Sequence, residues 1–165
     1  MGRNERQELA EFWKKLGNKV RGRPKALYDA LNILDLEDWQ KALIYLHARL
    51  ETGGTFDFPA RYNLWGIKFA NWMKAYGVRP RPVPTTEYEN GRWVKITDNF
   101  AEFQNFQHAL SIYLSLNSVR RALKNARTIE EFAHILKRYR YYTAPASNYA
   151  RLLRRHYEQV RRIVA

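Results

Sequence analysis

Hydrophobic residues recur at helical spacing through the first third of the chain and predict three helices. The first ends near Gly17, and Pro24 suits the first turn of the second. Asp35 is expected to cap the third helix, which ends at the glycines of residues 52–54. The apolar positions of these helices are, in order, Leu9, Phe12, Trp13 and Leu16; Leu27, Ala30, Leu31 and Leu34; and Trp39, Leu43, Leu46 and Leu50.

The pattern changes in the middle of the chain. Residues 76–84 contain three prolines, which excludes a helix there. Residues 85–88 and 92–96 flank Asn90 and Gly91, and this pair between two β-prone runs is the strongest short signal for a hairpin. The sequence therefore predicts one small β-hairpin between two groups of helices.

Helical periodicity returns after the hairpin. Thr128 and Glu131 form a capping box at the start of one helix, and a final basic helix is expected from near Ser147 to the end. The predicted fold class is therefore α+β and predominantly helical. The apolar positions of this second helical group are Phe103, Phe106, Leu110, Tyr113 and Leu114, followed by Ile129, Phe132, Ala133 and Leu136.

Length and composition indicate one globular domain over residues 1–165, with 45% hydrophobic and 15% aromatic residues. The absence of cysteine excludes disulfides, thiolate zinc sites and a cysteine nucleophile. No apolar run approaches the ~20 residues that span a bilayer. Because residues 1–6 lead into a charged amphipathic stretch, we expect no signal peptide.

The net charge of +13 is concentrated in the C-terminal third, where residues 118–165 hold 12 basic and 3 acidic side chains. Such a surface favours an anionic partner: nucleic acid, anionic lipid or an anionic cell-wall polymer. Tyr139, Tyr141 and Tyr142 alternate with arginines, a mixture that can also bind single-stranded nucleic acid. A basic helical binding domain, for nucleic acid or for glycan, is therefore the alternative to an enzyme.

Carboxylates stand at two places where core packing does not require them. Glu51 ends the apolar third helix beside a glycine turn, where partial burial would favour its neutral form and suit a general acid. Glu87 and Glu89 share one face of the first hairpin strand. Two carboxylates flanking a sugar are what glycoside hydrolysis needs. The alternative from position alone is that all three are solvated surface residues.

Four motifs, in order, resemble those of glycoside hydrolase family 73. Residues 48–54 (Ala-Arg-Leu-Glu-Thr-Gly-Gly) and 63–68 (Asn-Leu-Trp-Gly-Ile-Lys) resemble the family's Leu-Glu-Ser/Thr-Gly and Asn-Asn-Leu-Phe-Gly-Ile-Lys. Residues 85–91 resemble the hairpin of its flagellum-associated peptidoglycan hydrolases, and residues 142–153 resemble their Tyr-Ala-Thr-Asp-Pro-x-Tyr-Ala segment. The resemblance runs from about residue 40 to 155, which leaves residues 1–35 as N-terminal helices and 36–165 as a glucosaminidase-like region.

The resemblance implies a lysozyme-like fold, with the small β-hairpin lobe beside the catalytic cleft. It also implies cleavage of the β-1,4 bond between N-acetylglucosamine and N-acetylmuramic acid in peptidoglycan. Glu51 matches the general acid, Glu87 the second catalytic carboxylate and Tyr142 the site tyrosine, with Tyr141 as its alternative because the spacing to Tyr149 has one extra residue. The expected substrate-binding residues are Asn63, Trp65, Gly66, Ile67, Tyr88, Trp93 and Tyr141. Trp65 and Trp93 could equally belong to the core.

The chain departs from the family pattern at three places. Gly54 and Thr55 stand where the family has Trp-Gly, and His47 stands where it commonly has Gln, four residues before the acid. We expect His47 to be neutral and structural. Residues 69–84 have a length and prolines of their own and are expected to form a flap over the cleft.

The partner expected from this reading is the glycan strand of peptidoglycan, and the enzyme is expected to work without cofactor or metal. The basic C-terminal third would attract anionic wall or outer-membrane polymers. No nucleic acid partner is expected, and the protein is predicted to be a monomer. A phage endolysin or virion-associated lysin, or a piece of a larger exported protein, would fit a bacteriolytic enzyme with no signal peptide. The distance between Glu51 and Glu87 would separate retaining from inverting mechanisms, with attack by the substrate's own N-acetyl group as the third option.

Overall fold

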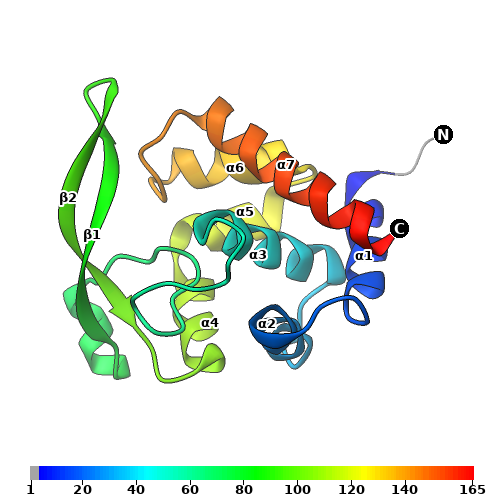
Figure 1. Cartoon of the computed structure of the whole chain (residues 1–165), viewed down its shortest axis with the longest axis horizontal. Helices are drawn as coiled ribbons and strands as arrows, with labels where there is room; N and C mark the ends of the chain where they lie inside the picture. Colours follow the sequence, from blue (N-terminus) through cyan, green and yellow to red (C-terminus); the bar gives the residue numbers. More distant parts are fainter. Residues whose placement is uncertain (1–3) are drawn as a thin grey trace.

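The computed structural model describes residues 4–165. Residues 1–3 belong to the predicted domain and to the N-terminus for which we expect no signal peptide, and they lie outside the described residues. Figure 1 shows a long hairpin standing on one side of a helical body, with the loop between α6 and α7 directed toward it. The predicted α+β, predominantly helical class with one hairpin is confirmed. The elements are α1 (Glu5–Leu16), α2 (Gly22–Asn32), α3 (Asp38–Glu51), the 3-10 helix η1 (Asn71–Tyr76), β1 (Arg79–Glu89), β2 (Arg92–Glu102), α4 (Phe106–Ser115), α5 (Asn117–Asn125), α6 (Ile129–Arg138) and α7 (Ala146–Val164).

Helix α3 is the central helix of the body. Every residue from 41 to 48 is buried, so the helix is covered on all sides, as in the core of a larger domain. Helices α1 and α7 pack against it, and α6 packs against both α5 and α7. The last residue of this buried helix is Glu51, which the fold thus carries to the edge of the core. Within residues 4–165, no helix has both the length and the hydrophobicity that crossing a bilayer requires.

The start of α3 differs from the sequence prediction. Asp35 is not its cap, because the helix begins at Asp38 and the N-cap position is Glu37, whose N–H donates to Gln40 Oε1 at 3.0 Å. Leu34 and Leu36 both pack against the core, and residues two apart reach the same side only if the chain between them is not helical. The core thus delays the start of the helix by two residues.

The later helix starts agree better with the sequence. Thr128 is the N-cap of α6, where its hydroxyl accepts a hydrogen bond from the N–H of Glu131 at 3.1 Å. Helix α7 begins at Ala146, one residue before the predicted start. Helix α5 (Asn117–Asn125) was not predicted, because its four buried positions lie among many polar residues.

The hairpin turn is the predicted one, but its strands are longer. Asn90 and Gly91 have φ of 50° and 80°, the left-handed values of a type I′ turn, and Glu89 pairs with Arg92 across it. The pairing continues to the ends of both strands, beyond the predicted 85–88 and 92–96. The predicted non-helical segment 76–84 therefore becomes mostly strand, and any closing motion of 69–84 stays a prediction.

Three prolines fit into β1 because they stand at every second position, where pairing with β2 needs no N–H. In a hairpin closed by a two-residue turn, the pair beside the turn exchanges hydrogen bonds and every second pair does not. Counting from the pair of Glu89 and Arg92, the prolines Pro80, Pro82 and Pro84 occupy non-exchanging positions. Each missing N–H would point away from β2, so the ladder loses nothing.

The base of the hairpin is fastened to the helical body through Asn63. Its Nδ2 donates to the carbonyls of Ile67 at 2.8 Å and Ala101 at 2.7 Å, and its Oδ1 accepts from the N–H of Ile67 at 3.0 Å. The side chain is fully buried. Residues 67–69 in turn pair with β2 at Phe100. The side chain of Asn63 therefore joins the loop after α3 to β2, the second strand of the hairpin.

We predict that Asn63→Ala lowers the free energy of unfolding by about 2–4 kcal/mol, because it leaves buried backbone groups without partners. Urea denaturation measures this directly. The control is Asn125→Ala, since Asn125 is exposed and its side chain bonds, among residues 4–165, only the carbonyl of Arg121 in its own helix. We expect the control to change stability by less than about 0.5 kcal/mol. Equal losses in the two variants would contradict this role of Asn63.

Candidate functional site

Glu51 is held at the end of α3 by a contact from another helix. The hydroxyl of Tyr149, on α7, donates a hydrogen bond to Oε1 of Glu51. His47, one turn earlier on α3, places its Nε2 at 3.8 Å from the same oxygen. The side chain of Glu51 is 24% exposed, so the carboxyl is mostly covered but open on one side.

The open side is defined by Gly66. Its φ is +64°, and a Cβ at this position would lie only 2.9 Å from Oε2 of Glu51. Position 66 therefore requires a glycine for two reasons: the backbone is left-handed, and a Cβ would collide with the carboxyl of Glu51. Among the described residues no hydrogen bond reaches Oε2, and none of their buried side-chain oxygens lacks a partner, so Oε2 is open to solvent.

The environment of Glu51 favours its protonated form. Burial raises the pKa of Glu51, the hydrogen bond from Tyr149 lowers it, and the charge of Glu87 raises it again. The result is a pKa raised from 4.5 to about 7. A carboxylic acid with this pKa holds its proton near neutral pH and can give it to a substrate.

Glu87 is brought to the same site from the hairpin, and its partners differ from those of Glu51. Lys68 Nζ lies 2.7 Å from Oε1 of Glu87 and 3.0 Å from Asp98 of β2. The hydroxyl of Thr143, in the loop between α6 and α7, donates to Oε2 of Glu87 at 2.9 Å. Both oxygens are thus engaged, as suits an ionised carboxylate. The structure places the two predicted carboxyl groups within electrostatic reach of each other.

His47 is neutral, as the sequence analysis expected. It is fully buried, and burial lowers its pKa from 6.5 to about 3. Its ring nitrogens bond the hydroxyls of Tyr113 at 2.7 Å and Tyr149 at 2.8 Å, so its partners are tyrosines of two other helices.

Three tyrosines surround the carboxyl in different ways. Tyr141 donates to the carbonyl of Trp65 at 2.5 Å, directly before Gly66. Tyr142 donates to the carbonyl of Ala133 at 2.8 Å, and its ring stacks on Tyr149 with centroids 3.7 Å apart. Only Tyr149 has a described hydrogen bond to Glu51, and it was not among the predicted site residues. The available signal was its place in the last family motif.

The predicted substrate-binding residues fall into two groups. Asn63, Trp65 and Ile67 are buried, and the indole N–H of Trp65 donates to the carbonyl of Ile44 at 3.0 Å, so these side chains shape the segment that presents Gly66. On the hairpin, Trp93 is 60% exposed and its ring meets that of Tyr88 edge to face at 5.3 Å. This pair is available to a ligand.

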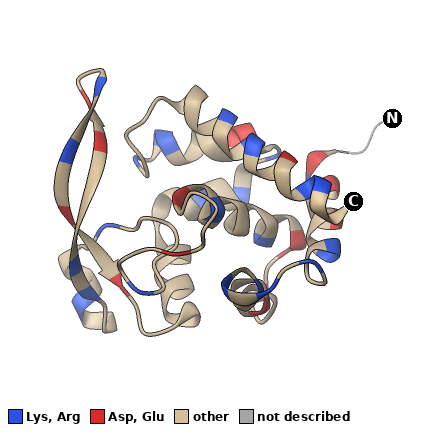
Figure 2. Cartoon of the chain, in the orientation of Figure 1, with Lys and Arg blue, Asp and Glu red and all other residues tan. Residues whose placement is uncertain are grey.

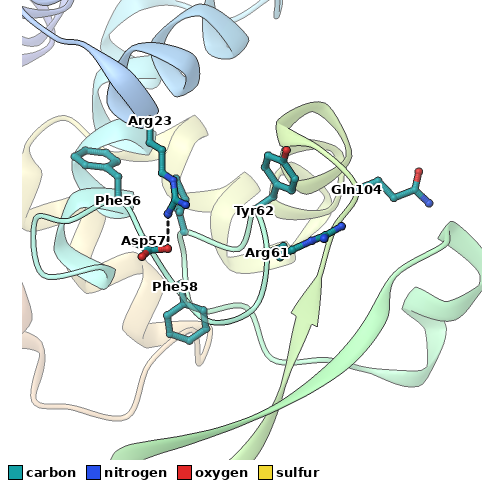
Figure 3. Close-up of a pocket in the computed structure, with 8 residues that line it drawn as sticks. Arg23, Phe56, Asp57, Phe58, Arg61, Tyr62 and Gln104 are labelled. Atoms are coloured by element: carbon teal, nitrogen blue, oxygen red, sulfur yellow. Dashed lines mark hydrogen bonds and ion pairs between the residues drawn. The ribbon is translucent and has the colours of Figure 1, made fainter.

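A cavity of about 300 Å³ is lined by Gly66. Lys68, Tyr139 and Tyr141 also line it. A second cavity, of about 340 Å³, lies around residues 56–64, where Figure 3 shows Arg23 reaching across to Asp57. None of the predicted site residues lines this second cavity, whereas the first connects directly with the glycine beside Glu51.

Figure 2 shows basic residues following one another along α7. Arg154 is paired with Glu5 and Glu130, and Arg161 with Glu158. The exposed Arg151, Arg155 and Arg162 recur at helical spacing and continue the basic surface predicted for the C-terminal third.

Sequence relatives of the chain are peptidoglycan hydrolases. No protein-family model matches the chain. Peptidoglycan hydrolase FlgJ of Salmonella typhimurium is 36% identical over 96 residues, which are 56% of this chain and 28% of that protein. FlgJ of Escherichia coli K12 is 34% identical over 106 residues, or 62% of this chain and 32% of that protein. The chain thus spans less than a third of the length of these curated relatives.

Solved structures extend the likeness over most of the chain. The glycoside hydrolase domain of Salmonella typhimurium FlgJ, truncated at its C-terminus, has a TM-score of 0.52 at 25% identity over 93% of this chain and 97% of that one. A peptidoglycan hydrolase mutant from Sphingomonas sp. A1 has a TM-score of 0.58 at 24% identity over 91% and 99%, which shows the shared fold. The resemblance to glycoside hydrolase family 73 is therefore confirmed, and the chain is a lysozyme-like domain related to the glycoside hydrolase domain of FlgJ.

Proposed function

We propose that the protein is a peptidoglycan hydrolase, an endo-β-N-acetylglucosaminidase that cleaves the β-1,4 bond between N-acetylglucosamine and N-acetylmuramic acid. The observation that carries the proposal is the carboxyl of Glu51, with a pKa of about 7 and one oxygen open to solvent, near the ion-paired carboxylate of Glu87. The names of the FlgJ relatives support the substrate class.

Glu51 is the general acid in this mechanism. Its proton passes from the carboxyl to the glycosidic oxygen as the bond from that oxygen to C1 of N-acetylglucosamine breaks. Protonation makes the leaving group an alcohol rather than an alkoxide, a contribution of about 10²–10⁴ in rate for general acid catalysis. Gly66 leaves room for the substrate oxygen to approach Oε2.

Glu87 acts on the sugar carbon. Its negative charge stabilises the positive charge that develops at C1, or it takes a proton from the water whose oxygen then bonds to C1. Lys68 and Thr143 fix both of its oxygens, so the hairpin is anchored where its carboxylate is used. Tyr88 and Trp93, near the hairpin tip, supply aromatic faces on which sugar rings can stack.

The basic surface supports a partner of the opposite sign. We propose that exposed arginines of α7 draw the protein to anionic wall or outer-membrane polymers, as expected of a lysin acting on intact wall. Attraction of this kind weakens as ionic strength rises, which distinguishes it from contacts within the cleft. A phage lysin and the catalytic part of an exported protein are both contexts for this chemistry.

The experiment that tests the function is digestion of purified peptidoglycan, with analysis of the released muropeptides. Wild type should create new reducing ends on N-acetylglucosamine. We expect Glu51→Gln to lower the rate by about 10³-fold and Glu87→Gln to be severely impaired as well. The matched control is Glu89→Gln, an exposed carboxylate two residues along the same strand, which should retain near-normal turnover.

Cleavage by Glu51→Gln at the wild-type rate would remove the proposed acid. Reducing ends on N-acetylmuramic acid would instead assign the other glycosidic bond. Salt-sensitive DNA binding without any glycan release would favour the alternative of a basic nucleic-acid-binding domain.

The pH dependence of turnover provides a second prediction. Glu51 must be protonated to act, and its pKa is about 7, so kcat/KM should fall tenfold per pH unit above that value. The profile is measured on purified peptidoglycan between pH 5 and 9 at constant ionic strength. A rate that is flat from pH 6 to 9 would show that no group of this pKa donates the proton.

A further inference from the structure

A chain of four polar side chains crosses the core behind the proposed acid. It begins at Tyr113 on α4, passes through His47 on α3 and Tyr149 on α7, and ends at Oε1 of Glu51. The hydroxyl of Tyr113 lies 2.7 Å from Nδ1 of His47, and the hydroxyl of Tyr149 lies 2.8 Å from its Nε2. Tyr113 and His47 are fully buried, so no water competes for these bonds.

The carboxylate of Glu51, at the end of this hydrogen-bond chain, determines which group donates in each of its hydrogen bonds. When Glu51 is ionised it can only accept, so the single proton of the Tyr149 hydroxyl points to it. The oxygen of Tyr149 must then accept from His47, which requires a proton on Nε2. A neutral imidazole carries one proton, so Nδ1 has a free lone pair that accepts from the hydroxyl of Tyr113.

The opposite direction leaves a buried proton unpaired. If Oε1 of Glu51 donated to Tyr149, then Tyr149 would donate to Nε2 and Nδ1–H would donate to Tyr113. The hydroxyl proton of Tyr113 would then need an acceptor, and His47 is its only hydrogen-bond partner among residues 4–165. An unsatisfied buried donor costs about 1–3 kcal/mol. The first order, in which each proton points from Tyr113 toward Glu51, pairs every proton of the four side chains.

The surroundings of His47 exclude the imidazolium form, in which both ring nitrogens would donate and the order of the hydrogen bonds would be lost. Phe132 meets its ring edge-on at 5.8 Å, and Tyr141 lies at 4.8 Å. The ionisable groups facing it are Glu51 from its own helix, Tyr113 from α4, Tyr149 from α7 and Tyr141 from the α6–α7 loop. Burial raises the pKa of all three tyrosines well above 10, so their hydroxyls keep their protons.

We propose that Tyr113 holds His47 in its Nε2–H tautomer and that His47, through Tyr149, reserves Oε1 of Glu51 as an acceptor. The transferable proton of Glu51 is then confined to Oε2, the oxygen that lies against Gly66 and is open to solvent. His47 and Tyr149 are positioning residues for the acid. The catalytic meaning of this order rests on the proposed function, but the tautomer and the hydrogen-bond direction do not.

The tautomer can be observed directly in the wild-type protein. Long-range ¹H–¹⁵N correlation spectra of the histidine rings, assigned with His47→Gln, distinguish a protonated from an unprotonated ring nitrogen. We expect Nε2 of His47 to be protonated and Nδ1 unprotonated, with no change between pH 5 and 8. A proton on Nδ1, or titration of the ring in this range, would overturn the proposal.

The order of these hydrogen bonds predicts that a change at Tyr113 alters the pKa of Glu51. In Tyr113→Phe, Nδ1 of His47 loses its donor, so the Nε2–H tautomer also leaves one buried ring atom without a partner. The preference for this tautomer becomes smaller, and in part of the molecules Tyr149 turns its proton from Glu51 to Nε2. The carboxyl pKa of Glu51, followed by ¹³C NMR, should then rise, although Tyr113 has no described hydrogen bond to Glu51. Tyr149→Phe removes the donor itself and should raise this pKa by about one unit.

The matched control is Tyr157→Phe, which removes a hydroxyl from another buried tyrosine of α7, outside the chain. It should leave the titration of Glu51 unchanged. If Tyr113→Phe behaves like this control, the chain does not transmit its direction and the proposal fails. If instead the NMR results are as expected while the wild-type protein releases nothing from peptidoglycan, the hydrogen-bond chain stands and the proposed function fails.

Discussion

A carboxyl group sits at the edge of a buried helix, where water cannot fully solvate its charge. Helix α3 is covered along most of its length. Its last residue, Glu51, is held by Tyr149 on one oxygen, and the other oxygen is left open because residue 66 is a glycine. Burial outweighs the hydrogen bond from Tyr149, so the net effect is a raised pKa. The rest of the arrangement depends on this balance: a more open Glu51 would be an ordinary ionised side chain, with no proton to give near neutral pH.

The hairpin supplies the second half of the site by a different physical route. Glu87 is not isolated from charge but paired with Lys68, so it can remain ionised beside a neighbour that is protonated. Two carboxyl groups in contrasting environments are the general pattern by which one site holds both an acid and a base. The fold achieves the contrast by taking one group from the core of the helical body and the other from a hairpin braced against Thr143.

The sequence was sufficient for features set by local rules. The turn at Asn90 and Gly91, the cap at Thr128 and the end of α3 at Glu51 follow from turn geometry, capping and periodicity. What it could not provide are contacts between distant elements. The hydrogen bonds of His47 join residues 66 and 102 positions away, so nothing near His47 indicates them. The delayed start of α3 likewise reflects packing of Leu34 and Leu36, which local capping preferences do not contain.

The most direct test of the buried carboxyl is the pH dependence of stability in wild type and Glu51→Gln. Because the folded pKa of about 7 exceeds the ordinary 4.5, the proton stabilises the fold below pH 4.5, and this contribution is lost as pH rises to about 7. Urea denaturation should therefore show the Gln variant gaining roughly 3 kcal/mol relative to wild type between pH 4 and pH 8. A stability difference that stays constant over this range would contradict a carboxyl held protonated by burial.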